Sequence, residues 1–244
     1  MKKIAILGLS LLSVSVAQAQ DAGGLRIGVK VGATYSSLSG KDASQIAGQG
    51  FNNDLGSFKL GYNAGIGTSF PISSDGFFSI APELLYNRKG FEVTSMQTIG
   101  NNEIETEQQR VLHYLDLPIL AKINAGGLFF ELGPQVSYLF GSKVKQQITT
   151  KNLTNGTKTK VDNDGSFQDY SGVKRGASDK SDLSQFDIAG VAGVGYQTEG
   201  GLSLGLRYAQ GFNSLIDSKD SKNEPKAFNN AFTLQLGYLL PLGK

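Results

Sequence analysis

The sequence predicts an all-β fold, an eight-stranded antiparallel up-and-down transmembrane β-barrel. Apolar and polar residues alternate with a period of two in eight segments, which is typical of strands with one apolar face. The connectors between these segments are short and long in strict alternation. Each segment covers about 10–13 residues, where a tilted membrane strand needs about 9–11 and an ordinary globular strand about 5–6.

The N-terminus has the composition of an export signal. Lys2 and Lys3 precede an uncharged, mostly apolar run over 4–16, and Ala17-Gln18-Ala19 forms an A-x-A cleavage site. The run is shorter than the roughly 20 residues that a transmembrane helix needs. We therefore expect a signal peptide at 1–19 and one outer-membrane β-barrel domain over 20–244.

The charge balance and the absence of cysteine exclude two classes of protein. Removal of the leader takes away Lys2 and Lys3 and no acid, which leaves 21 basic and 21 acidic residues. A net charge of zero argues against a nucleic-acid binder, which needs a basic face. Without cysteine, an exported domain of this size must be held by backbone hydrogen bonds and packing, and not by disulfides.

The alternation is clearest in the first segment, where Ile27, Val29 and Val31 are interleaved with Gly28 and Lys30. The other segments follow the same pattern, and we expect their apolar rows to face lipid. The eight expected strands cover 25–35, 58–70, 78–89, 111–123, 130–140, 186–197, 202–212 and 232–240.

Three connectors are short and contain glycine, and four are long and polar. The short ones, at 73–76, 124–127 and 198–201, predict tight hairpin turns. The long ones cover 39–57, 92–109, 141–184 and 213–229. Outer-membrane barrels keep short periplasmic turns and long extracellular loops, so we expect both termini in the periplasm and four loops outside. The 141–184 loop is expected to be mobile and solvated, serving either in binding or adhesion or as a shield over the barrel mouth.

If the apolar rows face lipid, the residues between them point into the barrel. Eight strands leave an interior that side chains fill, and an unpaired charge there is costly, so we expect cross-strand pairs. Asp116 and Glu131 are the leading acids, and Arg207 is expected to bridge to Asp187 or Glu83. A proton relay, an ion path or a catalytic pair is the alternative to this structural network. The predicted interior charges are Arg26, Lys30, Lys59, Glu83, Lys89, Asp116, Lys122, Glu131, Asp187 and Arg207.

The sequence predicts no catalytic, cofactor or metal site. The one histidine, His113, is expected on the outward face, with no serine–histidine–acid or metal cluster around it. The stretch 162–165 (DNDG) suggests calcium, but its glycine comes two residues too early for an EF-hand loop, so a turn is expected.

Five stretches carry a resemblance to a known family. They are "APELLYNRKGF", "YLDLPILAKI", "FELGPQVSYLFG", "FDIAGVAGVGY" and "LSLGLRYAQGF". In this order they resemble PorT-like outer-membrane β-barrel proteins, the "outer membrane protein beta-barrel domain" or porin-family proteins of Gram-negative bacteria. The resemblance implies the barrel fold and the cell outer membrane. It leaves the activity open, and one branch of the family is tied to protein secretion.

We expect a structural or interaction scaffold that displays long extracellular loops, without catalysis or cofactors. A narrow porin-like channel, a component of a protein secretion system and a lipocalin-like soluble carrier are the alternatives. The expected partners are outer-membrane lipid and the barrel-insertion machinery, with the extracellular partner open. Nucleic acid is not an expected partner, and the chain is expected to be a monomer.

Overall fold

The computed structural model describes residues 24–47, 52–163, 165–217 and 224–242, so the expected signal peptide at 1–19 lies outside the described residues. No helix within these ranges is long and apolar enough to cross a membrane. The elements are β1 (Arg26–Ser39), the 3-10 helix η2 (Ala43–Ala47), β2 (Asn52–Leu55), β3 (Lys59–Pro71), β4 (Phe78–Ile99), β5 (Asn102–Ala125), β6 (Leu128–Asn152), β7 (Lys158–Asp162), β8 (Ser166–Gln168), β9 (Lys174–Gly176), β10 (Phe186–Gln197), β11 (Leu202–Gly211) and β12 (Phe228–Pro241).

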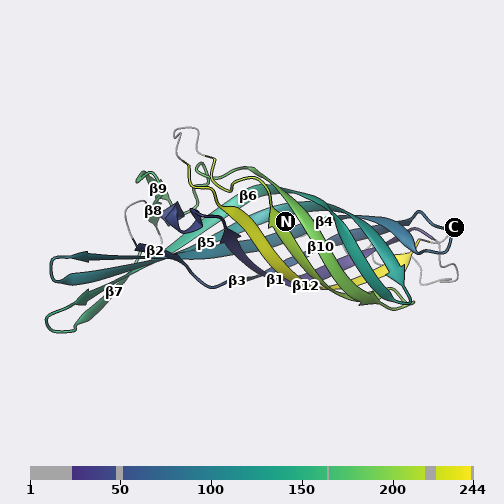
Figure 1. The fold of residues 1–244 in the computed structure, drawn as a ribbon, viewed down its shortest axis with the longest axis horizontal. Helices are drawn as coiled ribbons and strands as arrows, with labels where there is room; N and C mark the ends of the chain where they lie inside the picture. The colour runs from purple at the N-terminus through teal and green to yellow at the C-terminus, as the bar shows by residue number, and fades with distance from the viewer. Residues whose placement is uncertain (1–23, 48–51, 164, 218–223, 243–244) are drawn as a thin grey trace, which may run out of the picture.

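Eight of these strands close into a ring, which confirms the predicted fold class (Figure 1). The order around the ring is β1, β3, β4, β5, β6, β10, β11 and β12, and every neighbouring pair is antiparallel. The pairing of β1 with β12 closes the ring from Arg26↔Pro241 to Ser39↔Phe228. The barrel is therefore an up-and-down meander with no open edge.

The apolar rows of the barrel strands face outward, as predicted. Val31, Ile66, Leu204 and Leu236 are each about half exposed, although all four lie in the middle of a strand. The residues between them point inward and are mostly polar or small. A lipocalin-like carrier would have the opposite arrangement, so that alternative is wrong.

The three short connectors are tight turns, as predicted. Gly76, Gly126, Gly127 and Gly201 all have positive φ, between 60° and 92°. At Gly201 a Cβ atom would also lie 1.9 Å from the carbonyl oxygen of Leu239. Glycine at this turn therefore serves both the backbone conformation and the close approach of β12. We call this end of the barrel the short-turn end.

At the opposite end, the long-loop end, the predicted strand lengths were wrong. β4, β5 and β6 have 22, 24 and 25 residues, so the expected loop at 92–109 and the start of the one at 141–184 are strand. The prediction failed because both faces of these segments carry polar residues, which hides the alternation of apolar and polar residues. β2 pairs with β4, and β7 pairs with β6, so the outer parts of β4, β5 and β6 form one sheet with β2 and β7 (Figure 1). We call this the projecting sheet.

The main apolar core lies at the long-loop end, where strand residues meet residues from the connectors. Phe91, Leu112 and Tyr114 point into the barrel from β4 and β5, and each is at most 1% exposed. The cluster consists of Leu38, Ala43, Ile46, Phe91, Val93, Leu112, Tyr114, Leu139, Tyr170, Leu183, Leu215, Ile216 and Ala227. The connectors at this end therefore fold back over the barrel mouth. We call this cluster the cap.

Candidate functional site

Arg207 is at the centre of the interior charges. Its guanidinium donates to both carboxylate oxygens of Glu83, at 2.7 Å each, and to Glu131, with Nη2 3.0 Å from Oε2 and Nε bonded to Oε1. The ammonium of Lys30 pairs with Glu83 from the other side. Four strands, β11, β4, β6 and β1, therefore meet in one buried cluster of two acids and two bases, each residue at most 9% exposed.

Inward-facing glycines leave room for this cluster. A Cβ atom on Gly193 would lie 2.7 Å from Oε1 of Glu131 and 3.0 Å from Cγ of Arg207. A Cβ atom on Gly67 would lie 3.1 Å from Cε of Lys30. The long charged side chains thus fill the space that the glycines leave, as is typical of glycine in barrel strands.

Asp116 belongs to a second interior group. Its carboxylate accepts hydrogen bonds from Asn87 at 2.9 Å and pairs with Lys89 at 3.1 Å. The hydroxyl of Thr34 donates to Asn87 at 3.2 Å and accepts from Asn63 at 3.0 Å. This chain of polar contacts links β3, β1, β4 and β5 across the inside of the barrel.

Asp187 is not a partner of Arg207. Its carboxylate accepts a hydrogen bond from the side chain of Asn229 at 2.9 Å, and Asn229 also donates to the hydroxyl of Tyr114 at 3.2 Å. Of the two alternative partners expected for Arg207, the structure has Glu83 and not Asp187, and Glu131 is a second partner that the sequence did not indicate for this arginine.

The remaining predicted charges lie toward the two ends. Lys122 donates to the amide oxygen of Gln197 at 2.5 Å and lies 4.0 Å from the ring centre of Phe129. Lys59 pairs with Glu92, and both side chains are 24% exposed. Arg26 is half-buried at the start of β1 and takes part in none of the ion pairs found among the described residues.

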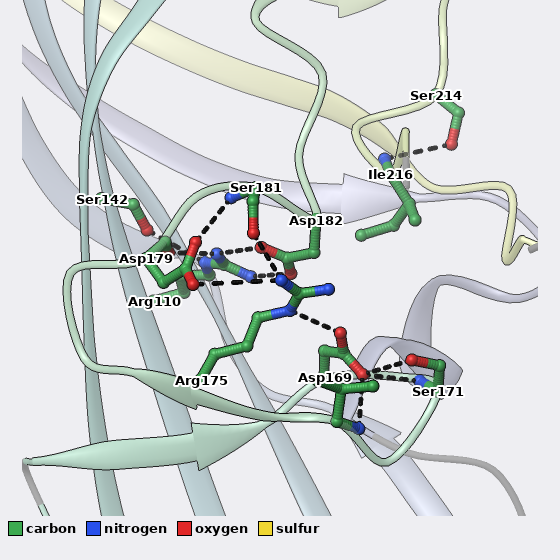
Figure 2. A network of polar contacts seen from close by, with 11 residues as sticks. Arg110, Ser142, Asp169, Ser171, Arg175, Asp179, Ser181, Asp182, Ser214 and Ile216 are labelled. Atoms are coloured by element: carbon green, nitrogen blue, oxygen red, sulfur yellow. Dashed lines mark hydrogen bonds and ion pairs between the residues drawn. The ribbon is translucent and has the colours of Figure 1, made fainter. Parts of the chain in front are cut away.

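The cap is fastened by a second arginine, Arg110 on β5, which is fully buried. Its two terminal nitrogens donate to the two carboxylate oxygens of Asp182, at 2.6 and 2.8 Å, and Nε donates to Ser142 at 3.0 Å. The guanidinium also lies 4.9 Å from the ring centre of Phe167 on β8. Figure 2 shows Arg110 with Ser142 and Asp182, and these hydrogen bonds tie the connector after β9 to the barrel wall.

Asp169 holds the turn between β8 and β9. It accepts hydrogen bonds from the hydroxyl of Ser171 at 2.7 Å, from the backbone N–H of Val173 at 3.0 Å and from Arg175 at 2.5 Å (Figure 2). Burial alone would raise the pKa of this carboxyl, but the hydrogen bonds from Ser171 and Arg175 outweigh it and hold the pKa below the ordinary value of 3.8. The stretch 166–176 of the predicted 141–184 loop is therefore a hydrogen-bonded turn, whereas β7 within the same loop is exposed at every residue, as a solvated segment would be.

The sequence prediction missed Arg110, Asp182 and Asp169. Arg110 shares the even-numbered inward row of β5 with Tyr114 and Asp116, so extending the alternation back along the strand would have placed it inside. Nothing local distinguishes Asp182 or Asp169 from the other acids of a polar connector.

The described residues hold no cluster of three or more His, Asp or Glu side chains that could bind a metal ion. His113 lies on the outward face of β5, where its Nδ1 is 2.8 Å from the hydroxyl of Tyr86 and its ring packs against Phe140. The interior carboxylates are held by bases and amides. The arrangement is therefore suited to filling and bracing the barrel.

Comparison with protein families places most of the chain. The family described as "Outer membrane protein beta-barrel domain" matches residues 16–217. No curated protein matches the chain.

Several solved outer-membrane structures are similar in outline. Ail, the attachment invasion locus protein of Yersinia pestis, is 10% identical with a TM-score of 0.38, and the likeness covers 89% of this chain and 99% of that chain. Neisserial surface protein A is 8% identical with a TM-score of 0.38, and the likeness covers 87% of this chain and 96% of that chain. OprG from Pseudomonas aeruginosa is 9% identical with a TM-score of 0.34, and the likeness covers 91% of this chain and 98% of that chain. At such values none of them indicates what this chain binds.

Arg207→Ala is expected to lower the free energy of unfolding by about 3–5 kcal/mol, because it leaves Glu83 and Glu131 buried with too few bases. Urea unfolding in lipid vesicles measures the loss, and because the chain has no tryptophan it is followed by the gel shift between folded and unfolded bands. The control Lys59→Ala breaks a partly exposed pair and should cost about 0–1 kcal/mol. Equal losses in the two variants would contradict the central role of Arg207.

Acid is expected to loosen the turn between β8 and β9. Because the folded pKa of Asp169 lies below its unfolded value, its stabilising contribution is present above about pH 4 and is lost as the pH falls through the folded pKa. Hydrogen-exchange protection factors over 166–176, corrected for intrinsic rates, should fall between pH 6 and about pH 3. Asp169→Asn should have low protection at both pH values, and an acid-induced fall of wild-type size in this variant would count against Asp169 as the cause.

Proposed function

The chain belongs to the outer membrane protein beta-barrel domain family and lies in the outer membrane, and from this premise we propose that it is a rigid scaffold for display outside the cell. The observation that carries the proposal is the continuity of β4, β5 and β6 from the short-turn end of the barrel into the projecting sheet. A surface built on uninterrupted strands keeps a fixed position relative to the membrane, as a binding surface requires.

The two faces of the projecting sheet differ in chemistry. Opposite residues of an antiparallel pair share a face, so Glu105 and Glu107 on β5 lie on the same side as Lys145 on β6 and Lys160 on β7. The other side is uncharged on these three strands and carries Ile104, Thr106, Ile148, Thr150, Thr159 and Val161. A sheet with one charged and one uncharged face offers two distinct surfaces to an extracellular partner.

The tips of the sheet are tied together. The backbone N–H of Leu153, beyond β6, donates to the carbonyl of Asn101 at 2.8 Å. Ile99 and Leu153 are 57% and 47% exposed at these tips. Two joined hairpins with exposed apolar residues at their ends support a role in interaction with another molecule.

A narrow channel is the second candidate, and the contents of the barrel argue against it. Arg207, Glu83, Glu131 and Lys30 occupy the interior, and the cap packs over the mouth at the long-loop end. An ion would have to pass between paired charges and then through an apolar layer that Arg110 and Asp182 hold in place. We therefore propose a closed barrel.

The proposal includes no catalysis and no cofactor. The single histidine, His113, contacts Tyr86 and Phe140 on the outward face and lies apart from the interior carboxylates. Because the ring of strands has no open edge, we propose a monomer, with outer-membrane lipid and the barrel-insertion machinery as its general partners. A part in protein secretion remains a lower-ranked candidate because no contact in the barrel or the projecting sheet favours it.

The proposed orientation is tested by labelling, which the absence of native cysteine makes simple. Thr98→Cys, at the tip of the projecting sheet, is expected to react with a membrane-impermeant maleimide on intact cells. Asp75→Cys, in the turn at 73–76 of the short-turn end, is the matched control and should react only after the outer membrane is opened. The reverse pattern would place the projecting sheet in the periplasm and would contradict the proposal.

A closed barrel is expected to leave the conductance of a planar lipid bilayer unchanged when the purified protein inserts. Arg207→Ala should also stay silent, because the cap still closes the mouth. Discrete, reproducible conductance steps from the folded wild-type protein would favour the channel instead.

A further inference from the structure

Arg88 on β4 is a charge on the wrong face of a membrane strand. On the outward row of β4 it follows Phe78, Ile80, Pro82, Leu84 and Tyr86, which are all uncharged, and the next charge along this row, Glu92, pairs with Lys59. Its neighbours in the row are Tyr62 on β3 and His113 on β5, and Tyr86 precedes it on the same face of β4. The aromatic neighbours place Arg88 at the interface between hydrocarbon and headgroups on the long-loop side.

Most hydrogen-bond donors of the Arg88 guanidinium have no acceptor among the described residues. It makes one hydrogen bond, from Nη1 to the carbonyl oxygen of Leu60 at 3.2 Å. It forms no ion pair within the described part of the chain. A guanidinium has five donors in a planar fork that matches a phosphate, so most of the capacity of Arg88 is directed away from the protein.

An apolar groove of about 780 Å³ runs beside Arg88 on the outer surface, and Arg88 is one of its walls. Small residues form its floor: Ala33 on β1 pairs with Leu234 on β12 and with Tyr62 on β3, and Ala64 pairs with Val31. The larger side chains of Leu234, Tyr62 and their neighbours stand on either side. The outward residues that line the groove are Val31, Ala33, Leu60, Tyr62, Ala64, Arg88, Leu204, Leu234 and Leu236.

We propose that this groove and Arg88 form a binding site for a phosphate-bearing lipid of the leaflet at the long-loop end. The acyl chain lies in the groove over Ala33 and Ala64, where it replaces looser contact with bulk lipid. The phosphate accepts a forked, charge-assisted pair of hydrogen bonds from Arg88. The charge fixes the headgroup chemistry, because an unpaired cation at the edge of hydrocarbon is favourable only when an anion covers it.

A lipid explains both halves of the site. Inorganic phosphate would use Arg88 and leave the groove empty, whereas a neutral lipid would fill the groove and leave the guanidinium unmatched. The inference adds a ligand site to the proposed scaffold and is independent of what the projecting sheet binds.

The test is native mass spectrometry of the full chain in a neutral detergent. The probes are diphosphorylated lipid A, dephosphorylated lipid A with the same acyl chains, and inorganic phosphate. The wild-type protein is expected to bind the diphosphorylated lipid about tenfold more tightly than the dephosphorylated one, as hydrogen bonds to a charged group predict. Inorganic phosphate alone should not compete at equal concentration.

Variants separate the charge from the groove. Arg88→Gln should abolish the preference for the phosphorylated lipid, and Arg88→Lys, which keeps the charge without the fork, should fall in between. Ala64→Leu narrows the groove and should weaken binding of both lipids. Lys145→Gln, on the charged face of the projecting sheet, is the matched control and should bind like the wild type. All variants are first shown to be folded by the gel shift.

Three results would overturn the proposal. The first is an unchanged lipid preference in Arg88→Gln. The second is an equal loss of preference in Lys145→Gln, which would indicate attraction by net charge alone. The third is full competition by inorganic phosphate, which would make the site an anion site without a lipid.

Discussion

A strand in hydrocarbon has no water to satisfy its backbone, so every N–H and C=O group must bond to a neighbouring strand. In this chain the pairing of β1 with β12 meets that requirement by closing the ring, and the rest of the structure follows from it. In a closed barrel, successive residues of each strand point alternately to the outside and to the inside. The apolar residues are needed on the lipid side, so the polar and charged residues are enclosed.

Enclosure makes the matching of charges a condition of the fold. An ion pair taken out of water contributes little net stability by itself, but removing one member leaves an uncompensated charge. Arg207 satisfies two carboxylates because its fork reaches Glu83 on one side and Glu131 on the other. Gly193 and Gly67 contribute by being small, since a Cβ atom on Gly193 would crowd Glu131 and Arg207 and one on Gly67 would crowd Lys30. The glycines of the strands and the charged side chains of the interior therefore depend on each other, because the glycines leave the space that the charged side chains fill.

The sequence was sufficient for features that depend on local pattern. All eight barrel strands, the three short turns and the inward position of Glu83 follow from a period of two and from glycine at turns. The partners of Arg207 were only partly predicted, because Glu83 and Glu131 both lie on strands that are not adjacent to β11, and contact across the lumen has no local signature. The cap was missed for a related reason. Ile46, Tyr170 and Leu183 are apolar residues that stand between polar or small neighbours in their connectors, and only the closed ring brings them together.

The projecting sheet inherits a constraint from the barrel below it. Its strands are continuations of β4, β5 and β6, so the side to which each residue points depends on its distance along the strand from the membrane and on one bulge in β6, where Tyr114 pairs with Leu139 but His113 pairs with Gly141. Insertion of one further residue beyond this bulge would exchange the charged and uncharged faces of everything that follows it on that strand. A change of two residues that is matched on the paired strand keeps both faces. The side chains of the exposed surface can therefore change one at a time, whereas the length of its strands is constrained by the pairing that continues upward from the barrel.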